Sequence, residues 1–200
     1  MKRVFDMVMA SLGLILFCPL LLVTAILIKL DSPGPIFFRQ DRIGKGFRRF
    51  RIYKFRTMVE DASTTGRSIT AGEDPRITRI GRFLRETKID ELPQLFNVLK
   101  GDMTFVGPRP EIPKYVNLFR KDFEEILQVR PGITDLASIK YRNEATILGR
   151  AQDPEEEYLR RVLPEKIALA KTYIHNASCF FDLKLIANTV VRIFQFDKAD

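Results

Sequence analysis

The chain has 200 residues and a formal net charge of +8, which suits one domain with a real core and polyanionic partners such as nucleic acid, anionic lipid or phosphorylated substrates. Its two cysteines, Cys18 and Cys179, exclude a disulfide framework and a cysteine-based metal site, and they favour a reducing compartment. The single histidine, His175, stands alone and is interpreted as structurally incidental.

The first predicted element is a membrane helix. Residues 7–28 carry no charge, and as a straight helix they would measure about 33 Å, enough to cross a bilayer. A signal peptide fits poorly, because Asp6 precedes the run and no small-x-small cleavage site follows it. A buried core helix of this apolarity fits poorly in so small a domain. We therefore expect the segment to enter a membrane.

Two features favour a re-entrant helix over a spanning one. Pro19 removes a backbone donor near the middle of the run, so a bend is expected there. Both flanks are basic, with Lys2 and Arg3 before the run and cations clustered over residues 39–56 after it, and the positive-inside tendency places both flanks in the cytoplasm. Prolines also occur in spanning helices, so the spanning alternative stays open.

A turn and a β-hairpin follow. The turn Ser32-Pro33-Gly34-Pro35 ends the apolar segment, and two runs rich in aromatic and β-branched residues, 36–40 and 47–58, flank a glycine-containing loop. In the second run one face is assigned Phe50, Ile52 and Phe55, and the other is assigned Arg49, Arg51 and Lys54. Most of these cations are interpreted as solvated or facing lipid headgroups, and Lys54 is singled out as functional.

An arginine-rich helix is predicted after a mobile polar loop over residues 59–73 that lies near the site. Asp74 is expected to cap this helix and Pro75 to occupy its first position. Its arginines recur at every third residue, at positions 76, 79, 82 and 85. Headgroups would offset the first two, whereas Arg85 is expected to reach a substrate phosphate.

Two adjacent carboxylates, Asp90 and Glu91, lie in this basic setting and begin a short amphipathic helix that Gly101 ends. Pro93 fits only in the first turn of that helix, and the apolar face is assigned Leu92, Leu95, Phe96 and Leu99. The structural alternative makes Asp90 an N-cap and Glu91 a first-turn acid. We interpret the pair instead as a nucleophile and a metal ligand.

The rest of the chain completes one domain. Pro108-Arg109-Pro110 fixes the backbone on both sides of one guanidinium, a rigid way to present a phosphate-binding group. Three helices are predicted in this part. The first covers residues 113–130, the second begins at Asp153 and is interrupted by Pro164, and the third runs from Asp182 to Phe196. The apolar face of the last helix either packs on the domain or lies in the membrane interface.

These motifs resemble those of the bacterial sugar transferases, also called monotopic phosphoglycosyl transferases. The resemblance runs over nearly the whole chain and rests on long motifs in the same order. They are KRVFD at the start, the proline-broken apolar helix, YKFRTM (53–58), DELPQLFNV (90–98), GDM (101–103), FVGPRP (105–110) and VRPGIT (129–134).

The resemblance implies an α+β, mostly helical fold, with a small cytoplasmic domain of amphipathic helices and a β-hairpin above a re-entrant membrane helix. Residues 1–31 would be that helix, bent near Pro19, and residues 32–200 the catalytic domain at the membrane interface. It implies monotopic attachment to the cytoplasmic face of the bacterial inner membrane. The implied reaction moves a phosphosugar from a UDP-sugar to undecaprenyl (polyprenol) phosphate and releases UMP, as the first membrane step of surface glycan assembly.

By the same resemblance, Asp90 is the nucleophile that forms a covalent phosphosugar intermediate, and Glu91 binds Mg²⁺. A carboxylate attacks a diphosphate only when that charge is neutralised, and Mg²⁺ with Lys54, Arg85 and Arg109 would do this. Asp90 then takes the phosphosugar, and polyprenol phosphate attacks the acyl phosphate.

The remaining substrate-binding residues are assigned by position in the family motifs. Pro108, Arg109 and Pro110 belong to the phosphate-binding surroundings, and Arg142 stands in a Tyr-Arg-Asn triplet where the family has Gly-Arg-Asn. The chain departs from the common Gly-Trp-Ala-Gln at residues 135–138, which leaves the identity of the sugar open. The oligomeric state also stays open, a homodimer included.

Two other functions are weighed against this interpretation. A membrane-anchored basic protein that binds anionic lipid or nucleic acid explains the charge and the anchor, but not an acidic pair among arginines. It also lacks a nucleic-acid-binding motif with interleaved aromatics, so no nucleic-acid partner is expected. A phosphohydrolase would share the aspartyl-phosphate intermediate and use water as the acceptor.

Overall fold

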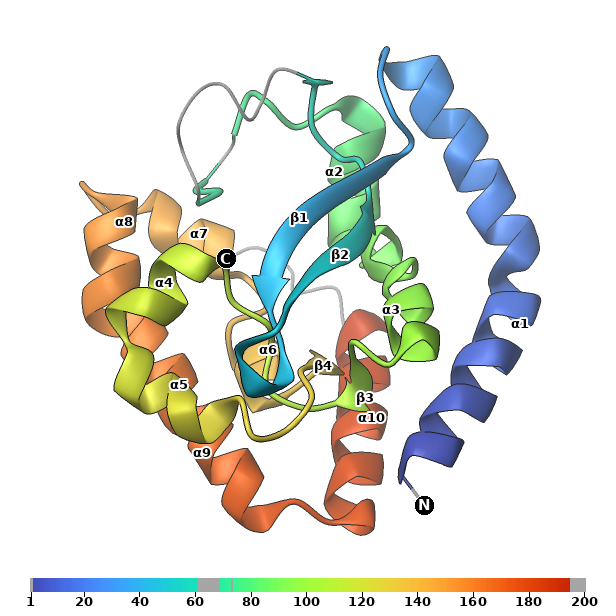
Figure 1. The fold of residues 1–200 in the computed structure, drawn as a ribbon. Helices are drawn as coiled ribbons and strands as arrows, with labels where there is room; N and C mark the ends of the chain where they lie inside the picture. The colour runs from blue at the N-terminus through green and yellow to red at the C-terminus, as the bar shows by residue number, and fades with distance from the viewer. Residues whose placement is uncertain (1, 61–68, 73, 195–200) are drawn as a thin grey trace.

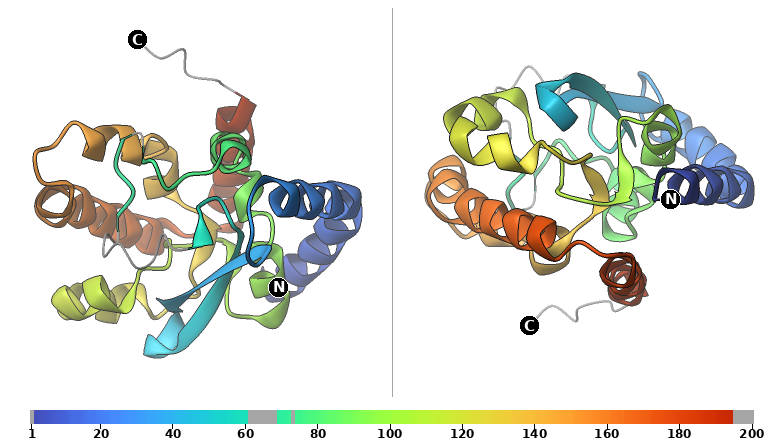
Figure 2. Two further views of the ribbon diagram at one scale, coloured as in Figure 1. Left: turned by 90° about the horizontal axis from the view of Figure 1, so that it is seen from above. Right: turned by 60° about the horizontal axis from the view of Figure 1, so that its bottom comes forward.

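The computed structural model describes residues 2–60, 69–72 and 74–194, and its first element is a long apolar helix along one side of the molecule (Figure 1). Helix α1 spans Lys2–Asp31 and continues through Pro19, with a bowed ribbon (Figures 1 and 2). Among the described helices it alone is long and apolar enough to cross a membrane, and only 11% of its most apolar window is buried. So little burial does not suit the core helix of a water-soluble domain.

The N-terminal end of α1 is fastened to the rest of the chain by polar contacts. The Lys2 ammonium lies 2.7 Å from the Asp182 carboxylate, and Arg3 donates to two carbonyls at the end of α3 (Gln94–Lys100). Asp6 is buried and accepts a hydrogen bond of 2.7 Å from the Thr104 hydroxyl. These contacts hold the first turns of α1 against the domain.

The C-terminal end of α1 is held by Arg56, which is buried and follows the hairpin. Its guanidinium donates to the carbonyl of Ser32 at 2.7 Å and also to the carbonyl of Pro33. The Asp31 carboxylate accepts from the backbone N–H of Ile80 at 3.2 Å. Both ends of α1 therefore contact the same domain.

The predicted β-hairpin is confirmed. Strand β1 (Phe37–Ile43) pairs antiparallel with β2 (Arg49–Phe55), and the connection is shorter than expected because Asp41 to Ile43 continue β1 opposite Arg51 to Arg49. The assignment of Lys54 to the face of Arg49 and Arg51 is wrong. Alternation along β2 places it on the face of the buried Ile52, from which it reaches the interior of the domain.

The arginine-rich helix begins later than predicted. Helix α2 (Arg79–Glu86) is capped by Thr78, whose hydroxyl accepts from the Gly81 N–H at 3.0 Å. A bridge between Met58 and Ile77 keeps the preceding residues extended, and Asp74 receives the Arg76 side chain instead of capping a helix. Most of the predicted mobile loop, residues 61–68 and 73, lies outside the described residues.

The acidic pair lies on a 3₁₀ turn, Ile89–Glu91, which leads into α3. Pro93 directly precedes α3 and Gly101, at φ 91°, ends it, as the sequence predicts. The predicted apolar face is only partly correct. Phe96 is 41% exposed, whereas the polar Gln94 and Asn97 are buried beside Leu95.

The second half of the chain contains a parallel strand pair that the sequence did not predict, β3 (Thr104–Val106) with β4 (Gly132–Thr134). The helix predicted over 113–130 is two helices, because Phe119 leaves the helical region at φ −112°, ψ 35°. The helices of this half are α4 (Pro113–Leu118), α5 (Arg120–Ile126), α6 (Leu136–Lys140), α7 (Glu144–Gly149), α8 (Pro154–Glu157), α9 (Leu163–Asn176) and α10 (Cys179–Phe194).

Side-chain caps begin α8 and α10, whereas α9 has none and continues from a π-helical turn. Asp153 caps α8 as predicted, and a π-helical turn precedes Pro164 at the start of α9. The prediction that Asp182 caps the last helix is wrong, because the Ser178 hydroxyl accepts from the Phe181 N–H and α10 begins earlier. Leu185 of α10 packs on the domain while Val190 is exposed.

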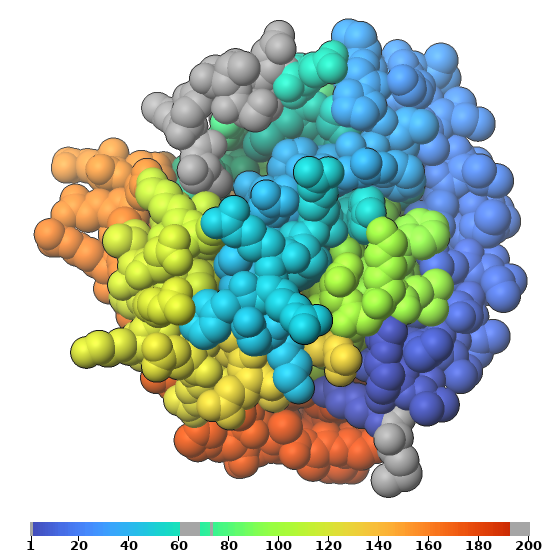
Figure 3. Space-filling model, viewed as in Figure 1, coloured from blue at the N-terminus to red at the C-terminus, as the bar shows by residue number. Residues whose placement is uncertain are grey.

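Separate hydrophobic cores hold the parts together. One lies among α4, α5 and α9 and contains Tyr115, Phe123 and Val162. Another joins α1, β2 and α3 through Ala10, Ile52 and Val98. In the space-filling view α1 forms one flank of the molecule and the hairpin crosses the front (Figure 3). The acidic pair belongs to the turn between α2 and α3, which contacts β2 and whose Ile89 packs against a cluster that includes Ile28 of α1.

Candidate active site

Two cations from distant segments converge on the Glu91 carboxylate. The Lys54 ammonium of β2 lies 2.8 Å from Oε1. The Arg109 guanidinium, from the loop after β3, donates to Oε1 at 2.5 Å and to Oε2 at 3.2 Å. The Glu91 side chain is only 15% exposed. A forked arginine and a lysine on one buried carboxylate make a site of fixed geometry.

The local backbone conformation fixes the position of the acidic pair. Lys88 adopts the left-handed conformation at φ 60°, which turns the chain out of α2 and into the 3₁₀ turn. Pro93, at φ −61°, has the angle that its ring requires and leads directly into α3. The two carboxylates therefore stand on a turn that is fixed at both ends.

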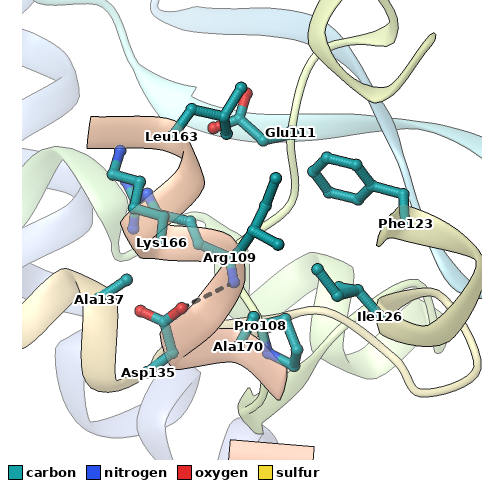
Figure 4. Close-up of a pocket in the computed structure, with 11 residues that line it drawn as sticks. Pro108, Arg109, Glu111, Phe123, Ile126, Asp135, Ala137, Leu163, Lys166 and Ala170 are labelled. Carbon is teal, nitrogen blue, oxygen red and sulfur yellow. Dashed lines mark hydrogen bonds between the residues drawn. The ribbon is translucent and has the colours of Figure 1, made fainter. Parts of the chain in front are cut away.

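The Pro-Arg-Pro loop is fastened through its backbone. Pro108 and Pro110 are buried, and the Arg109 N–H donates to Asp135 at 3.0 Å (Figure 4). The other oxygen of Asp135 accepts from the Ser138 N–H and caps α6. A small cavity of about 20 Å³ lies behind this loop, against α5 and α9. The prolines thus act as scaffold, and the Arg109 side chain makes the contact with Glu91.

Asp90 is the other half of the pair, and its environment differs. It is 6% exposed, and its Oδ1 has no hydrogen-bond partner among the described residues. Burial raises the pKa of Asp90 to about 6, an effect that Lys54 partly opposes and the Glu91 charge reinforces. Burial alone would also raise the pKa of Glu91, but Arg109 and Lys54 outweigh it and hold that pKa well below its usual range. The pair therefore divides into Glu91, which stays ionised, and Asp90, whose pKa lies close to neutral pH.

Arg85 lies near enough to Asp90 for their charges to interact. One terminal nitrogen donates to the Thr70 hydroxyl at 3.1 Å, and the other, Nη1, is buried without a partner among the described residues. Burial lowers the pKa of Arg85, and the Asp90 charge opposes this. The placement agrees with the predicted phosphate-binding role, which stays a prediction.

Arg142 lies elsewhere. It lines a hollow of about 330 Å³ between α6, α7 and the end of α10, together with Thr146, Arg150 and Arg192. None of the described hydrogen bonds and ion pairs of Glu91 involves it. Its predicted contact with substrate remains a prediction.

The sequence interpretation missed two residues that position the site. Asn97 is fully buried, and its side chain hydrogen-bonds the edge of β2 that is not paired with β1. It accepts from the Tyr53 N–H at 2.9 Å and donates to the Arg51 carbonyl at 2.8 Å. Asp135 holds the Arg109 backbone. The sequence held no signal for Asn97, because at helical spacing it lies away from the predicted face of Leu92, Leu95 and Leu99, and only the packing of α3 on β2 buries it.

The residues present fit a magnesium ion, although the described residues include no cluster of three or more metal-binding side chains. Mg²⁺ commonly binds through one or two carboxylates together with substrate phosphates and water. Among the described residues Asp90 Oδ1 has no partner, and Glu91 Oε2 accepts a single hydrogen bond, which leaves it a lone pair. The donor set is therefore of the right chemistry.

Comparison with known proteins places the chain in a family. The sequence profile of the family described as "Bacterial sugar transferase" matches residues 1–196. A "UDP-glucose:undecaprenyl-phosphate glucose-1-phosphate transferase" of Caulobacter vibrioides is 42% identical over 203 residues, 99% of this chain and 71% of the relative. This chain belongs to the bacterial sugar transferase family, whose members are transferases.

Other relatives differ in length and in the sugar that they are named for. A "UDP-N-acetylgalactosamine-undecaprenyl-phosphate N-acetylgalactosaminephosphotransferase" of Aeromonas hydrophila is 41% identical over 192 residues, 94% of this chain but 42% of the relative. The "Exopolysaccharide production protein PSS" of Rhizobium leguminosarum bv. phaseoli is 39% identical over 199 residues, 96% of this chain and 94% of the relative. The chain thus spans under half of the first and nearly all of the second.

Proposed function

We propose that this chain transfers a sugar 1-phosphate from a UDP-sugar to undecaprenyl phosphate and releases UMP. The observation that carries the proposal is the buried Asp90, one oxygen of which has no partner in the described part of the chain, beside Glu91 held by Lys54 and Arg109. The names of the relatives supply the donor and acceptor classes. The exposed apolar helix α1 would attach the domain to a membrane, where a lipid acceptor is found.

In the first step a carboxylate oxygen of Asp90 attacks the phosphorus that carries the sugar. A bond from this oxygen to phosphorus forms, and the bond from phosphorus to the bridging oxygen breaks, so that UMP leaves with that oxygen. Asp90 must be ionised to attack. Arg85, close to Asp90, would offset the charge of the transferring group, while Arg109 and Lys54 keep the neighbouring Glu91 in place.

In the second step an oxygen of undecaprenyl phosphate attacks the same phosphorus, and the Asp90 carboxylate leaves. The product is a lipid diphosphate sugar, and Asp90 returns to its ionised form. Dividing the reaction in this way lets UMP leave before the lipid acceptor reacts, while the phosphosugar stays on Asp90. One nucleophile then serves both substrates.

Glu91 Oε2 and Asp90 Oδ1 are the atoms proposed to hold Mg²⁺. When bound, the ion would neutralise diphosphate charge and stabilise the charge that develops on the leaving nucleotide. Lys54 and Arg109 would keep Glu91 ionised and therefore able to bind a cation, because they hold its pKa low.

We propose further that α1 enters and leaves the bilayer on the cytoplasmic side. Lys2 contacts Asp182 at one end of the helix, and Asp31 contacts Ile80 at the other, both within the same domain. A helix that crossed the bilayer would carry Lys2 to the far side, away from this partner. Fixing both ends on one domain supports the re-entrant form, and it would keep the acidic pair at the lipid surface.

A donor screen tests the reaction. The purified chain in nanodiscs is given UDP-glucose or UDP-N-acetylgalactosamine with undecaprenyl phosphate and Mg²⁺, and UMP and lipid-linked sugar are measured together. The proposal predicts equal amounts of both with at least one donor. UMP with free sugar phosphate and no lipid product would identify a phosphohydrolase instead.

A further inference from the structure

The buried face of α3 is unusually polar. Continuous helical backbone joins the acidic pair to this helix, since Leu92 (φ −53°, ψ −36°) and Pro93 (φ −61°, ψ −14°) both have helical angles. Asp90, Gln94 and Asn97 stand at i, i+4 and i+7, so they share one side of this helical stretch. They are 6%, 1% and 0% exposed. Three polar side chains therefore occupy a face where apolar ones would pack.

Only one of the three is satisfied by the protein. Asn97 bonds the backbone of β2 with both ends of its carboxamide. The amide nitrogen of Gln94 and Oδ1 of Asp90 are buried without partners among the described residues, so they do not bond to each other. Buried donors that stay unpaired are rare in native proteins and costly, which indicates a group that is bound during function.

The unpaired atoms define the chemistry of that group. Gln94 Nε2 and Arg85 Nη1 are two buried donors near the nucleophile, and neither has a partner among the described residues. Arg85 is close enough to Asp90 for their charges to interact. Two donors beside an attacking carboxylate suit the anionic oxygens of the group that the carboxylate takes up. A water molecule can accept from two donors but carries no charge, whereas a phosphoryl group offers an anionic oxygen to each of them.

We infer that the Gln94 side-chain amide donates a hydrogen bond to a non-bridging oxygen of the phosphoryl group while that group is transferred to and from Asp90. The inference rests on the proposed function and adds a second donor beside Arg85. Because the same phosphoryl oxygens take part in both steps, Gln94 stabilises formation and breakdown of the acyl phosphate alike. The bonds that form and break are those of the two steps given above.

Single-turnover kinetics of the full chain in nanodiscs test this role. The donor is UDP-glucose or UDP-N-acetylgalactosamine, whichever the wild-type protein turns over, and the rate of UMP release, its burst amplitude and the acceptor-dependent step are measured separately. Gln94→Met keeps the volume and removes the donor. Gln94→Glu keeps the size and places a negative charge against the phosphoryl oxygens. Gln128→Met, at an exposed position after α5, is the control.

We expect both rate constants per active site to fall about 10- to 100-fold in Gln94→Met and at least as far in Gln94→Glu, with the control unchanged. Rate constants within about twofold of wild type would overturn the inference. A loss confined to burst amplitude or melting temperature would overturn it too, because that is the result of a packing role. A wild-type protein that releases no UMP from any member of a panel of UDP-sugars would overturn the proposed function as well, and it is recognised before any variant is compared.

Discussion

Arg109 donates both arms of its guanidinium to the carboxylate of Glu91, at 2.5 Å and 3.2 Å. The two residues are 18 positions apart in the sequence. Arg109 lies on a loop between two buried prolines, and Glu91 lies on the 3₁₀ turn that also carries Asp90. This pairing fixes the orientation of Glu91 and keeps it ionised, while the adjacent Asp90 has an oxygen that none of the described residues contacts by a hydrogen bond. The first prediction concerns this fork.

Replacing Arg109 with lysine is expected to lower kcat/KM about 10- to 100-fold, although the charge is kept. Lysine offers one ammonium in place of a planar fork, so one of the two contacts with Glu91 is lost and the carboxylate can rotate. Steady-state UMP release measures the effect. Arg120→Lys, at an exposed position on α5, is the matched control. Full activity in Arg109→Lys would show that the bidentate contact has no catalytic role.

A pH profile tests the state of Asp90. Because burial raises its pKa to about 6, Asp90 is protonated below that pH and cannot attack, so kcat/KM should fall about tenfold per pH unit below 6. Lys54 lowers the pKa of Asp90, so Lys54→Met should move this acidic limb to higher pH. Lys100→Met, which removes a lysine bonded to the Tyr53 hydroxyl, should leave the limb in place. A limb that stays near pH 4 in the wild type contradicts the assignment.

Asn97→Leu should destabilise the fold by about 2–4 kcal/mol, since a β2 donor and a β2 acceptor lose their buried partner at once. Leucine has the same number of side-chain heavy atoms as asparagine and no hydrogen-bonding group, and its greater bulk at this buried site adds to the loss. Thermal unfolding in detergent gives the shift in melting temperature. Asn176→Leu, in an exposed last turn of α9, serves as control. Equal melting temperatures for Asn97→Leu and wild type would mean that water replaces the lost bonds.

The topology of α1 predicts where the N-terminus lies. A short tag before Lys2 should resist an impermeant reagent in intact cells and become accessible in inside-out vesicles. A tag on the C-terminus should behave in the same way, because both ends of α1 are held by one domain. Labelling of the N-terminal tag alone in intact cells would establish a spanning helix.

The sequence predicted the parts of the site whose chemistry is local. Asp90 and Glu91 are adjacent, and the two prolines around Arg109 restrict the backbone wherever they occur. The hairpin and the Gly101 helix end followed from patterns of a few residues. These features depend on residues that are adjacent in the sequence, so they can be predicted from a single sequence.

Contacts between distant segments escaped prediction. The sequence pattern assigns Lys54 to the wrong face of β2, because Phe55 is apolar like Phe50 and Ile52 and so obscures the alternation. The late start of α2 depends on a bridge between Met58 and Ile77, and the polar face of α3 depends on the open edge of β2 beside Asn97. Contacts with distant segments determine these features, and the periodicity of a single segment carries no information about such contacts.

The central claim is that Asp90 becomes covalently attached to the sugar phosphate. Intact-protein mass spectrometry after mixing with a UDP-sugar and Mg²⁺, without acceptor, measures this directly. The wild-type protein should gain the mass of one phosphosugar and lose it when undecaprenyl phosphate is added, whereas Asp90→Asn should gain nothing. An adduct of the same mass on Asp90→Asn, or lipid-linked product from that variant at the wild-type rate, would contradict the account.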